Sequence, residues 1–221
     1  MRKAKKRSMN KLRIRIVSIS ACLCLSVSMI SAQERGAKSE AVVRSYLKER
    51  HIDVTQHNSL KLFFNGHDKF EDLFSHIRQA KNSVHLEYFN FRNDSIAGLT
   101  FQLLGEKAQQ GITVRAMYDA FGNSSNNKPL KKVHTSAIRA TGVDLVEYDP
   151  IRFPWVNHIV PRDHRKIVVV DDKTGYTGGM NIADYYVVGL EKIGEWHDIH
   201  MRLEGPVVNR SEEHTSELQS R

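Results

Sequence analysis

Cysteine is almost missing from this 221-residue chain. The two that are present, Cys22 and Cys24, lie within an apolar leader near the N-terminus. The rest of the chain therefore has no side chain for a disulfide, a thiolate nucleophile or cysteine-ligated zinc.

Acidic residues are missing from the first fifteen positions, which hold 8 of the 33 basic residues. The remainder contains equal numbers of basic and acidic side chains, so the net charge of +8 belongs to the leader. A surface that binds the nucleic-acid backbone is expected to be basic, so no nucleic-acid partner is expected.

Charge is also missing from Ile16–Ala32, a run of 17 residues with five serines. The run is short for a membrane span, so a cleaved secretory signal over residues 1–32 is favoured over a retained anchor. A lipoprotein box at Ile19–Cys22 is the weakest alternative. All three interpretations direct the domain to the bacterial cell membrane, and the positive-inside rule places Glu34 onward on its periplasmic or outer side.

The opposite terminus, Arg210–Arg221, reads RSEEHTSELQSR and resembles the translation of a sequencing-library adapter. We expect an artefactual tail at 210–221 and a natural reading frame that is interrupted near Asn209. Between the ends we expect a helical lead-in at 33–58 and one catalytic half-domain at 59–209.

Strand and helix patterns alternate through this half-domain. Apolar runs predict strands at 60–64, 84–91, 112–118, 143–148 and 165–171, and helical periodicity predicts helices at 39–51, 68–80, 96–110 and 129–140. Asp94 and Ser95 are placed to cap the third helix, and Asn123–Asn127 is expected to be a polar turn. The alternation predicts an α/β fold with a mixed, largely parallel sheet flanked by helices.

The stretch His164–Asn181, HRKIVVVDDKTGYTGGMN, carries the most specific signal. Alternation along the strand places His164 and Lys166 on one face and Asp171 on the other, where a structural ion-pair partner is favoured over a catalytic acid. Gly178 and Gly179 allow a close backbone approach to phosphate. Asn181 follows them at an expected helix start, where free N–H groups favour an anion.

This spacing resembles the HKD motif of the phospholipase D superfamily. Leu86–Asn123 and Trp196–Val208 resemble the bacterial cardiolipin synthase branch, as does the Gly-Gly pair where nucleases of the superfamily carry Gly-Ser. The resemblance implies transfer of a phosphatidyl group between phosphatidylglycerol molecules through a phosphohistidine, without a cofactor or a metal.

Roles follow from that chemistry. His164 is the candidate nucleophile or proton donor, Lys166 and Asn181 stabilise phosphoryl charge, and the resemblance includes Asp171 in the catalytic set. Asp198 is the candidate acceptor that orients the imidazole. Candidate substrate-binding residues are Gly178, Gly179 and three residues at strand ends, namely Glu87, Tyr88 and Asp119. His197 and His200 are three residues apart on a strand, which argues against a shared metal.

A second copy of the motif is absent between Gln33 and Asn209. The superfamily resemblance implies two His-Lys pairs facing each other across the phosphate. The second is expected from a missing C-terminal half or from another subunit. Two alternatives remain open, a homodimeric phosphodiesterase or nuclease and an inactive fragment.

Overall fold

The computed structural model describes residues 38–52, 54–150 and 162–209. The chain divides into two units, Met1–Val54 and Thr55–Arg221. In the first unit, residues 38–49 are helical, as the sequence predicts. The expected signal or anchor, the lipoprotein box and the adapter-like tail lie outside the described residues. No helix in the described ranges is long and apolar enough to cross a bilayer.

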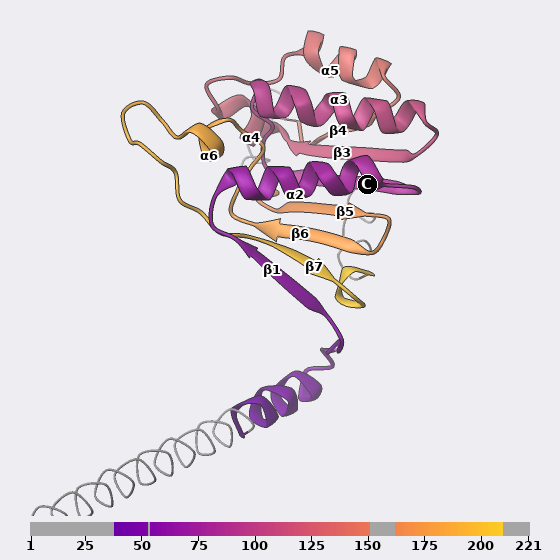
Figure 1. Ribbon diagram of the computed structural model, residues 1–221, viewed down its shortest axis with the longest axis vertical. Helices are drawn as coiled ribbons and strands as arrows, with labels where there is room; N and C mark the ends of the chain where they lie inside the picture. The colour runs from indigo at the N-terminus through magenta and orange to yellow at the C-terminus, as the bar shows by residue number, and fades with distance from the viewer. Residues whose placement is uncertain (1–37, 53, 151–161, 210–221) are drawn as a thin grey trace, which may run out of the picture. The chain divides into compact units, whose positions relative to one another are not determined.

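The second unit is built on one seven-stranded sheet in the order β1-β7-β6-β5-β2-β3-β4 (Figure 1). Its strands are β1 (Ser59–Phe63), β2 (Ser83–Tyr88), β3 (Thr113–Asp119), β4 (Asp144–Tyr148), β5 (Lys166–Val170), β6 (Thr174–Gly178) and β7 (His200–Glu204). Its helices are α2 (Gly66–Gln79), α3 (Ser95–Gln109), α4 (Ala120–Ser125), α5 (Lys132–Ala140) and α6 (Tyr185–Val188).

The α/β class and the mixed sheet are confirmed, but the parallel share is smaller than expected. Only β2–β3 and β3–β4 pair in parallel, and the other four pairings are antiparallel. One reason is that β5 and β6 are joined by a short hairpin, which can connect only antiparallel neighbours. The longer segment 179–199, which contains α6, leads to β7, which also pairs antiparallel with β6. Helical crossovers join the neighbouring pairs β2–β3 and β3–β4, and α2 connects β1 to the non-adjacent β2.

Local signals place the helices that cover the sheet. The Asn65 side chain caps α2 by accepting from the Asp68 N–H, and Asp94 caps α3 by accepting from Ala97, as predicted for Asp94. Apolar side chains of α2 and α3 then pack on alternate residues of the sheet. The fully buried members include Leu73, Ile77, Leu104, Val84, Leu86 and Val168.

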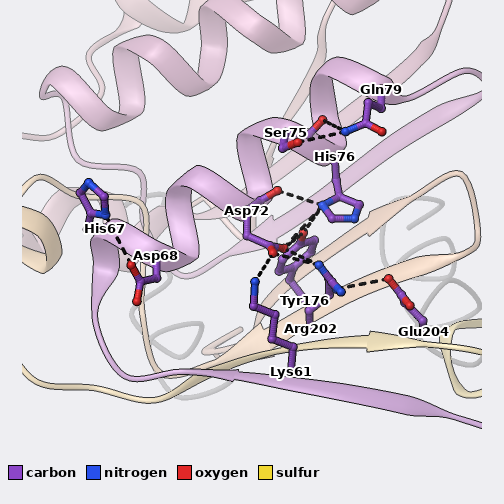
Figure 2. A network of polar contacts seen from close by, with 10 residues as sticks. All are labelled: Lys61, His67, Asp68, Asp72, Ser75, His76, Gln79, Tyr176, Arg202 and Glu204. Carbon is purple, nitrogen blue, oxygen red and sulfur yellow. Dashed lines mark hydrogen bonds and ion pairs between the residues drawn. The ribbon is translucent and has the colours of Figure 1, made fainter.

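A polar network fixes α2 to the β1, β7 and β6 end of the sheet (Figure 2). Asp72 of α2 accepts hydrogen bonds from Lys61 at 2.7 Å, Tyr176 at 2.7 Å and Arg202 at 2.9 Å. Glu204 extends the network with an ion pair to Arg202 at 3.3 Å. One helical carboxylate therefore joins three different strands.

The expected polar turn at Asn123–Asn127 is wrong in part, because residues up to Ser125 belong to α4. The Asp119 side chain at the end of β3 accepts from the N–H groups of Phe121 and Gly122, at 2.8 and 2.9 Å, and so starts this short helix. Capping by a strand-end carboxylate outweighs the turn preference of the asparagines and serines.

Candidate active site

The carboxyl ends of β2, β3 and β4 share one edge of the sheet with the starts of β5 and β7 and the end of β6. Strand β5 begins at Lys166 and continues through the β-branched run from Ile167 to Val170. His164 therefore lies just outside the strand, at the edge where several chain segments meet. This is the usual place for a site in an open α/β sheet.

His164 and Lys166 lie together, as the motif spacing predicts. The Lys166 ammonium is 3.1 Å from His164 Nδ1, 3.2 Å from Nε2 and donates to the His164 carbonyl oxygen at 2.7 Å. His164 is exposed and its ring contacts Phe89 with centroids 4.6 Å apart, whereas Lys166 is only 4% exposed. The pair presents an accessible imidazole above a largely buried cation.

The protonation states of this pair suit nucleophilic attack. Burial, with the neighbouring Lys166, lowers the pKa of His164, so its ring is neutral at pH 7. Burial lowers the pKa of Lys166 to about 8, while Asp163 and Asp198 act in the opposite direction and favour its charged form. A neutral imidazole and a protonated amine therefore coexist near neutral pH.

Gly179 and Asp198 lie in close contact beside this pair. A Cβ added to Gly179 would overlap the Asp198 carboxylate, and one added to Gly178 would lie 2.7 Å from Nδ1 of His200. Gly178 also has a φ of +151°, a conformation that other residues rarely adopt. Glycine at both positions is therefore required by the packing of the segment 198–200.

A pair of buried carboxyl groups, Glu87 and Asp163, contacts Arg165, which lies between His164 and Lys166 in the motif. Arg165 Nε lies 2.8 Å from Oε1 of Glu87 and 3.2 Å from Oδ1 of Asp163. Burial and a hydrogen bond with Asp163 raise the pKa of Glu87 to about 9, so Glu87 holds a proton at pH 7. Burial alone would raise the pKa of Asp163, but hydrogen bonds from Glu87 and Arg165 outweigh it and lower this pKa.

Asp119 anchors the segment that leads into the motif. Besides capping α4, it accepts from the Asp163 N–H at 3.0 Å and forms an ion pair with Arg162 at 3.5 Å. The backbone immediately before His164 is therefore tied to the end of β3.

Comparison with known proteins agrees with this geometry. Residues 73–190 match the family described as cardiolipin synthase, PLD-like domain. The chain is 34% identical over 163 residues to the probable cardiolipin synthase YwiE of Bacillus subtilis, covering 73% of this chain and 32% of that protein. It is also 34% identical over 173 residues to cardiolipin synthase of Staphylococcus aureus strain Mu50, covering 78% and 34%.

The chain belongs to the cardiolipin synthase, PLD-like domain family. It spans about a third of the length of these curated relatives.

Solved structures show the same fold at low identity. Nuc from Salmonella typhimurium, a phospholipase D family member, aligns with a TM-score of 0.55 at 17% identity, covering 74% of this chain and 95% of that one. Phosphatidylserine synthase of Haemophilus influenzae Rd KW20 aligns with a TM-score of 0.56 at 15% identity, covering 70% and 35%.

Several candidate residues of this PLD-like domain lie away from the position expected for them. Asp171 follows the far end of β5, about 16 Å along the strand from Lys166. Its carboxylate accepts from the N–H groups of Lys81, Asn82 and Ser83 in the loop before β2, contacts that favour a structural role. Lys173 acts on it electrostatically, but the direct partners of Asp171 among the described residues are these backbone donors.

Asn181 is buried, but the predicted helix start at this residue is wrong. Helix α6 begins only at Tyr185. The segment between is held because the Asp184 side chain accepts from Ile96 at 2.7 Å, and Asp94 accepts from the Asp184 N–H at 2.9 Å. These contacts with the start of α3 hold the segment before α6, in which Ile182 forms an isolated bridge with Phe91.

The predicted bond between Asp198 and His164 is not among the contacts of the described residues. Asp198 instead accepts from the Ile199 N–H at 2.7 Å, beside Gly179. The residues Glu87, Tyr88 and Asp119 are at most 1% exposed, so they lie behind the site and do not line an open pocket.

Four residues near the site were not singled out from the sequence as functional. Phe89 contacts the His164 ring, Asp163 precedes it, and Lys69 and His200 are buried behind Lys166. A signal existed only for Asp163, which adjoins the motif. The other three are brought close by strand pairing and by packing of α2.

Proposed function

We propose that the protein is a cardiolipin synthase-like phosphatidyltransferase that acts on phosphatidylglycerol in a membrane. The observation that carries the proposal is the exposed, neutral His164 imidazole in contact with the Lys166 ammonium, in a chain of this family. No cofactor is required for the steps that follow.

In the first step, the free electron pair of a His164 ring nitrogen attacks the phosphorus of phosphatidylglycerol. The bond between phosphorus and the glycerol oxygen breaks, and the departing alkoxide takes a proton from a general acid. Lys166 donates to the phosphoryl oxygens as negative charge accumulates, and the same role is proposed for Asn181. The product is a phosphatidyl group on His164 and free glycerol.

In the second step, a hydroxyl of another phosphatidylglycerol attacks the phosphohistidine. The phosphorus–nitrogen bond breaks, the hydroxyl proton passes to the general base, and cardiolipin is released. The general acid and base is proposed to be a histidine of a second motif, from a C-terminal half or another subunit. A membrane-directed leader at residues 1–32 and export of the catalytic part remain predictions consistent with a lipid substrate.

The test supplies the purified chain with phosphatidylglycerol vesicles and follows cardiolipin and glycerol in equal amounts. His164→Asn should abolish both products, because an amide cannot form the phosphorus–nitrogen intermediate. His67→Asn is the matched control, because His67 is an exposed histidine on α2 outside the site. Cardiolipin formation that survives His164→Asn would overturn the mechanism.

A homodimeric phosphodiesterase acting on nucleic acid is the second candidate. It is favoured by the single motif and by a fold that covers 95% of the Salmonella Nuc chain. The balanced charge beyond the leader argues against it. Cleavage of DNA that weakens with salt, without lipid products, would select this candidate, and no reaction with either substrate would indicate an inactive fragment.

A further inference from the structure

Two buried basic side chains behind Lys166 have no part in the steps above. Lys69 of α2 and His200 of β7 are both 0% exposed. Lys69 donates to the Tyr88 hydroxyl at 3.4 Å and lies 3.8 Å from the centre of the Phe70 ring. Neither ring nitrogen of His200 has a hydrogen-bond partner in the described part of the chain. A histidine without hydrogen-bond partners is costly to bury, and Lys69 has a hydroxyl and aromatic rings but no carboxylate of the described residues to offset its burial.

Strand register places His200, and Tyr88 to which Lys69 donates, in one row of neighbouring strand positions with Lys166. Tyr88 pairs with Lys166 across β2 and β5, and Gly178 pairs with His200 across β6 and β7. Because Ile167 pairs with Thr177, Lys166 lies opposite Gly178. Alternation then points all of these side chains to the face that α2 covers.

Gly178 lies in this row between Lys166 and His200. It has no side chain, and the His200 ring occupies the position next to it, since Nδ1 would be 2.7 Å from an added Cβ. Both Lys69 and Lys166 act electrostatically on His200. His200 thus lies within the field of two amines, one at the phosphate site and one sealed behind it.

Lys69 and His200 differ in whether their charge can change near neutral pH. Burial, followed by the two lysines, lowers the pKa of His200 to about 2, so this ring stays neutral. Burial lowers the pKa of Lys69 well below its ordinary value, and no carboxylate of the described residues acts to restore it. Lys69 is therefore a group whose charge an added anion could change.

We propose that Lys69 takes up one proton from the solvent when an anionic phosphate occupies the site at His164 and Lys166, with His200 as the neutral group between the two amines. The amine becomes an ammonium and no covalent bond changes. Among the described residues, Tyr88 from β2 accepts a hydrogen bond from Lys69, and His200 from β7 is acted on by both Lys69 and Lys166 of β5, while Tyr186 from α6 acts on Tyr88. The added charge would offset the negative charge that develops at phosphorus. The inference rests on the proposed function only for the location of the phosphate.

The test is calorimetric titration with sulfate, a tetrahedral dianion that does not itself titrate near pH 7. Titrations at pH 7 in buffers of different ionisation enthalpy give the number of protons bound with the anion. We expect uptake by the unaltered chain, and a decrease approaching one proton with at least tenfold weaker binding in Lys69→Met. His164→Asn separates any uptake at the catalytic imidazole from uptake at Lys69.

Lys107→Met is the matched control. Lys107 is also a buried lysine, but it lies on α3 and donates to the Ala80 carbonyl at 3.2 Å. This variant should leave both the affinity and the proton count unchanged. Equal uptake in Lys69→Met and the unaltered chain, or no sulfate binding or uptake by the unaltered chain, would overturn the proposal.

A second measurement covers the case in which Lys69→Met does not fold. Lysine-selective ¹³C NMR of the unaltered chain should show two side chains with lowered pKa values, and Lys166→Met identifies one of them. The other must shift toward its ammonium position as sulfate saturates the protein, and a resonance that stays in place contradicts the proposal. Neither readout involves lipid turnover, so failure of lipid transfer and failure of proton uptake are separate results.

Discussion

The Lys166 ammonium lies within 3.2 Å of both ring nitrogens of His164 and 2.7 Å from its carbonyl oxygen. One cation therefore holds the side chain and the backbone of the residue that is proposed to attack. In the proposed mechanism, a phosphate that enters draws the ammonium from the ring toward its own oxygens. This exchange would free the imidazole nitrogen for attack.

Lys166 should give the reaction an alkaline limit. Its pKa is lowered to about 8, so the ammonium is present below pH 8 and is lost as the pH rises above it. We expect kcat/KM to fall tenfold per pH unit above about 8. Lys166→Arg should be slower at pH 7 but lack this decrease, because a guanidinium stays charged. An unchanged alkaline limit in Lys166→Arg would assign the limit to another group.

Gly179→Ala should disable the site with little loss of stability elsewhere. The added methyl group overlaps the Asp198 carboxylate, so the segments at 179 and 198 must separate. A displacement of about 1 Å can reduce turnover by about 100-fold. Gly98→Ala is the control, because its Cβ meets nothing within 4 Å on the exposed side of α3, and it should add about 0.5–1 kcal/mol of stability. Equal turnover in Gly179→Ala and Gly98→Ala would show that the close contact between Gly179 and Asp198 does not matter for the site.

The carboxyl pair Glu87 and Asp163 should affect stability in a definite pH range. The pKa of Glu87 is about 9 in the folded protein against 4.5 ordinarily, so the folded state binds more protons between these values. Its contribution to stability is therefore complete below pH 4.5 and is lost as the pH rises toward 9. Glu87→Gln, which is neutral at all pH, should remove this slope in urea unfolding measured from pH 5 to 9. The idea fails if parent and variant show parallel slopes.

The Asp72 network should contribute to stability at the opposite end of the pH range. Burial would raise the pKa of Asp72, but hydrogen bonds from Lys61, Tyr176 and Arg202 outweigh it and lower this pKa. Its contribution is therefore present above pH 3.8 and is lost as the pH falls through the lowered value. Asp72→Asn should reduce the free energy of unfolding at pH 7 by about 1–3 kcal/mol.

The exposed Asp144 provides the comparison for that variant. It lies 3.9 Å from Arg115 and its side chain is 65% exposed, so Asp144→Asn should change stability by less than about 0.5 kcal/mol. Equal losses of unfolding free energy in Asp72→Asn and Asp144→Asn would show that the Asp72 network stabilises the fold no more than an exposed ion pair.

Local signals account for what could be predicted from the sequence. The valine run of β5, the apolar faces of α2 and α3 and the Asp94 cap depend on neighbouring residues, and each is found where expected. The pairing of His164 with Lys166 also follows from two-residue spacing. The direction of strand pairing was less accessible, because alternation does not record whether the next strand runs parallel or antiparallel.

Contacts between distant segments account for what could not be predicted. Asn181 lies outside a helix because the segment after it is tied to the start of α3: the Asp94 carboxylate accepts from the Asp184 N–H, and the Asp184 carboxylate accepts from the Ile96 N–H. Lys69 reads as an ordinary polar position of an amphipathic helix, and its burial follows only from the way α2 crosses the sheet. The His200 ring can be buried there because its neighbour on β6 is Gly178, which has no side chain.

The first and last strands of the sheet are neighbours, with Ser59 opposite Glu204. The start of β1 and the end of β7 are thus a few ångströms apart. A unit of this kind can be inserted into a larger protein without stretching either junction, and a short linker across the gap would permit circular permutation. The pairing of β1 with β7 therefore makes the unit suited to insertion as a module.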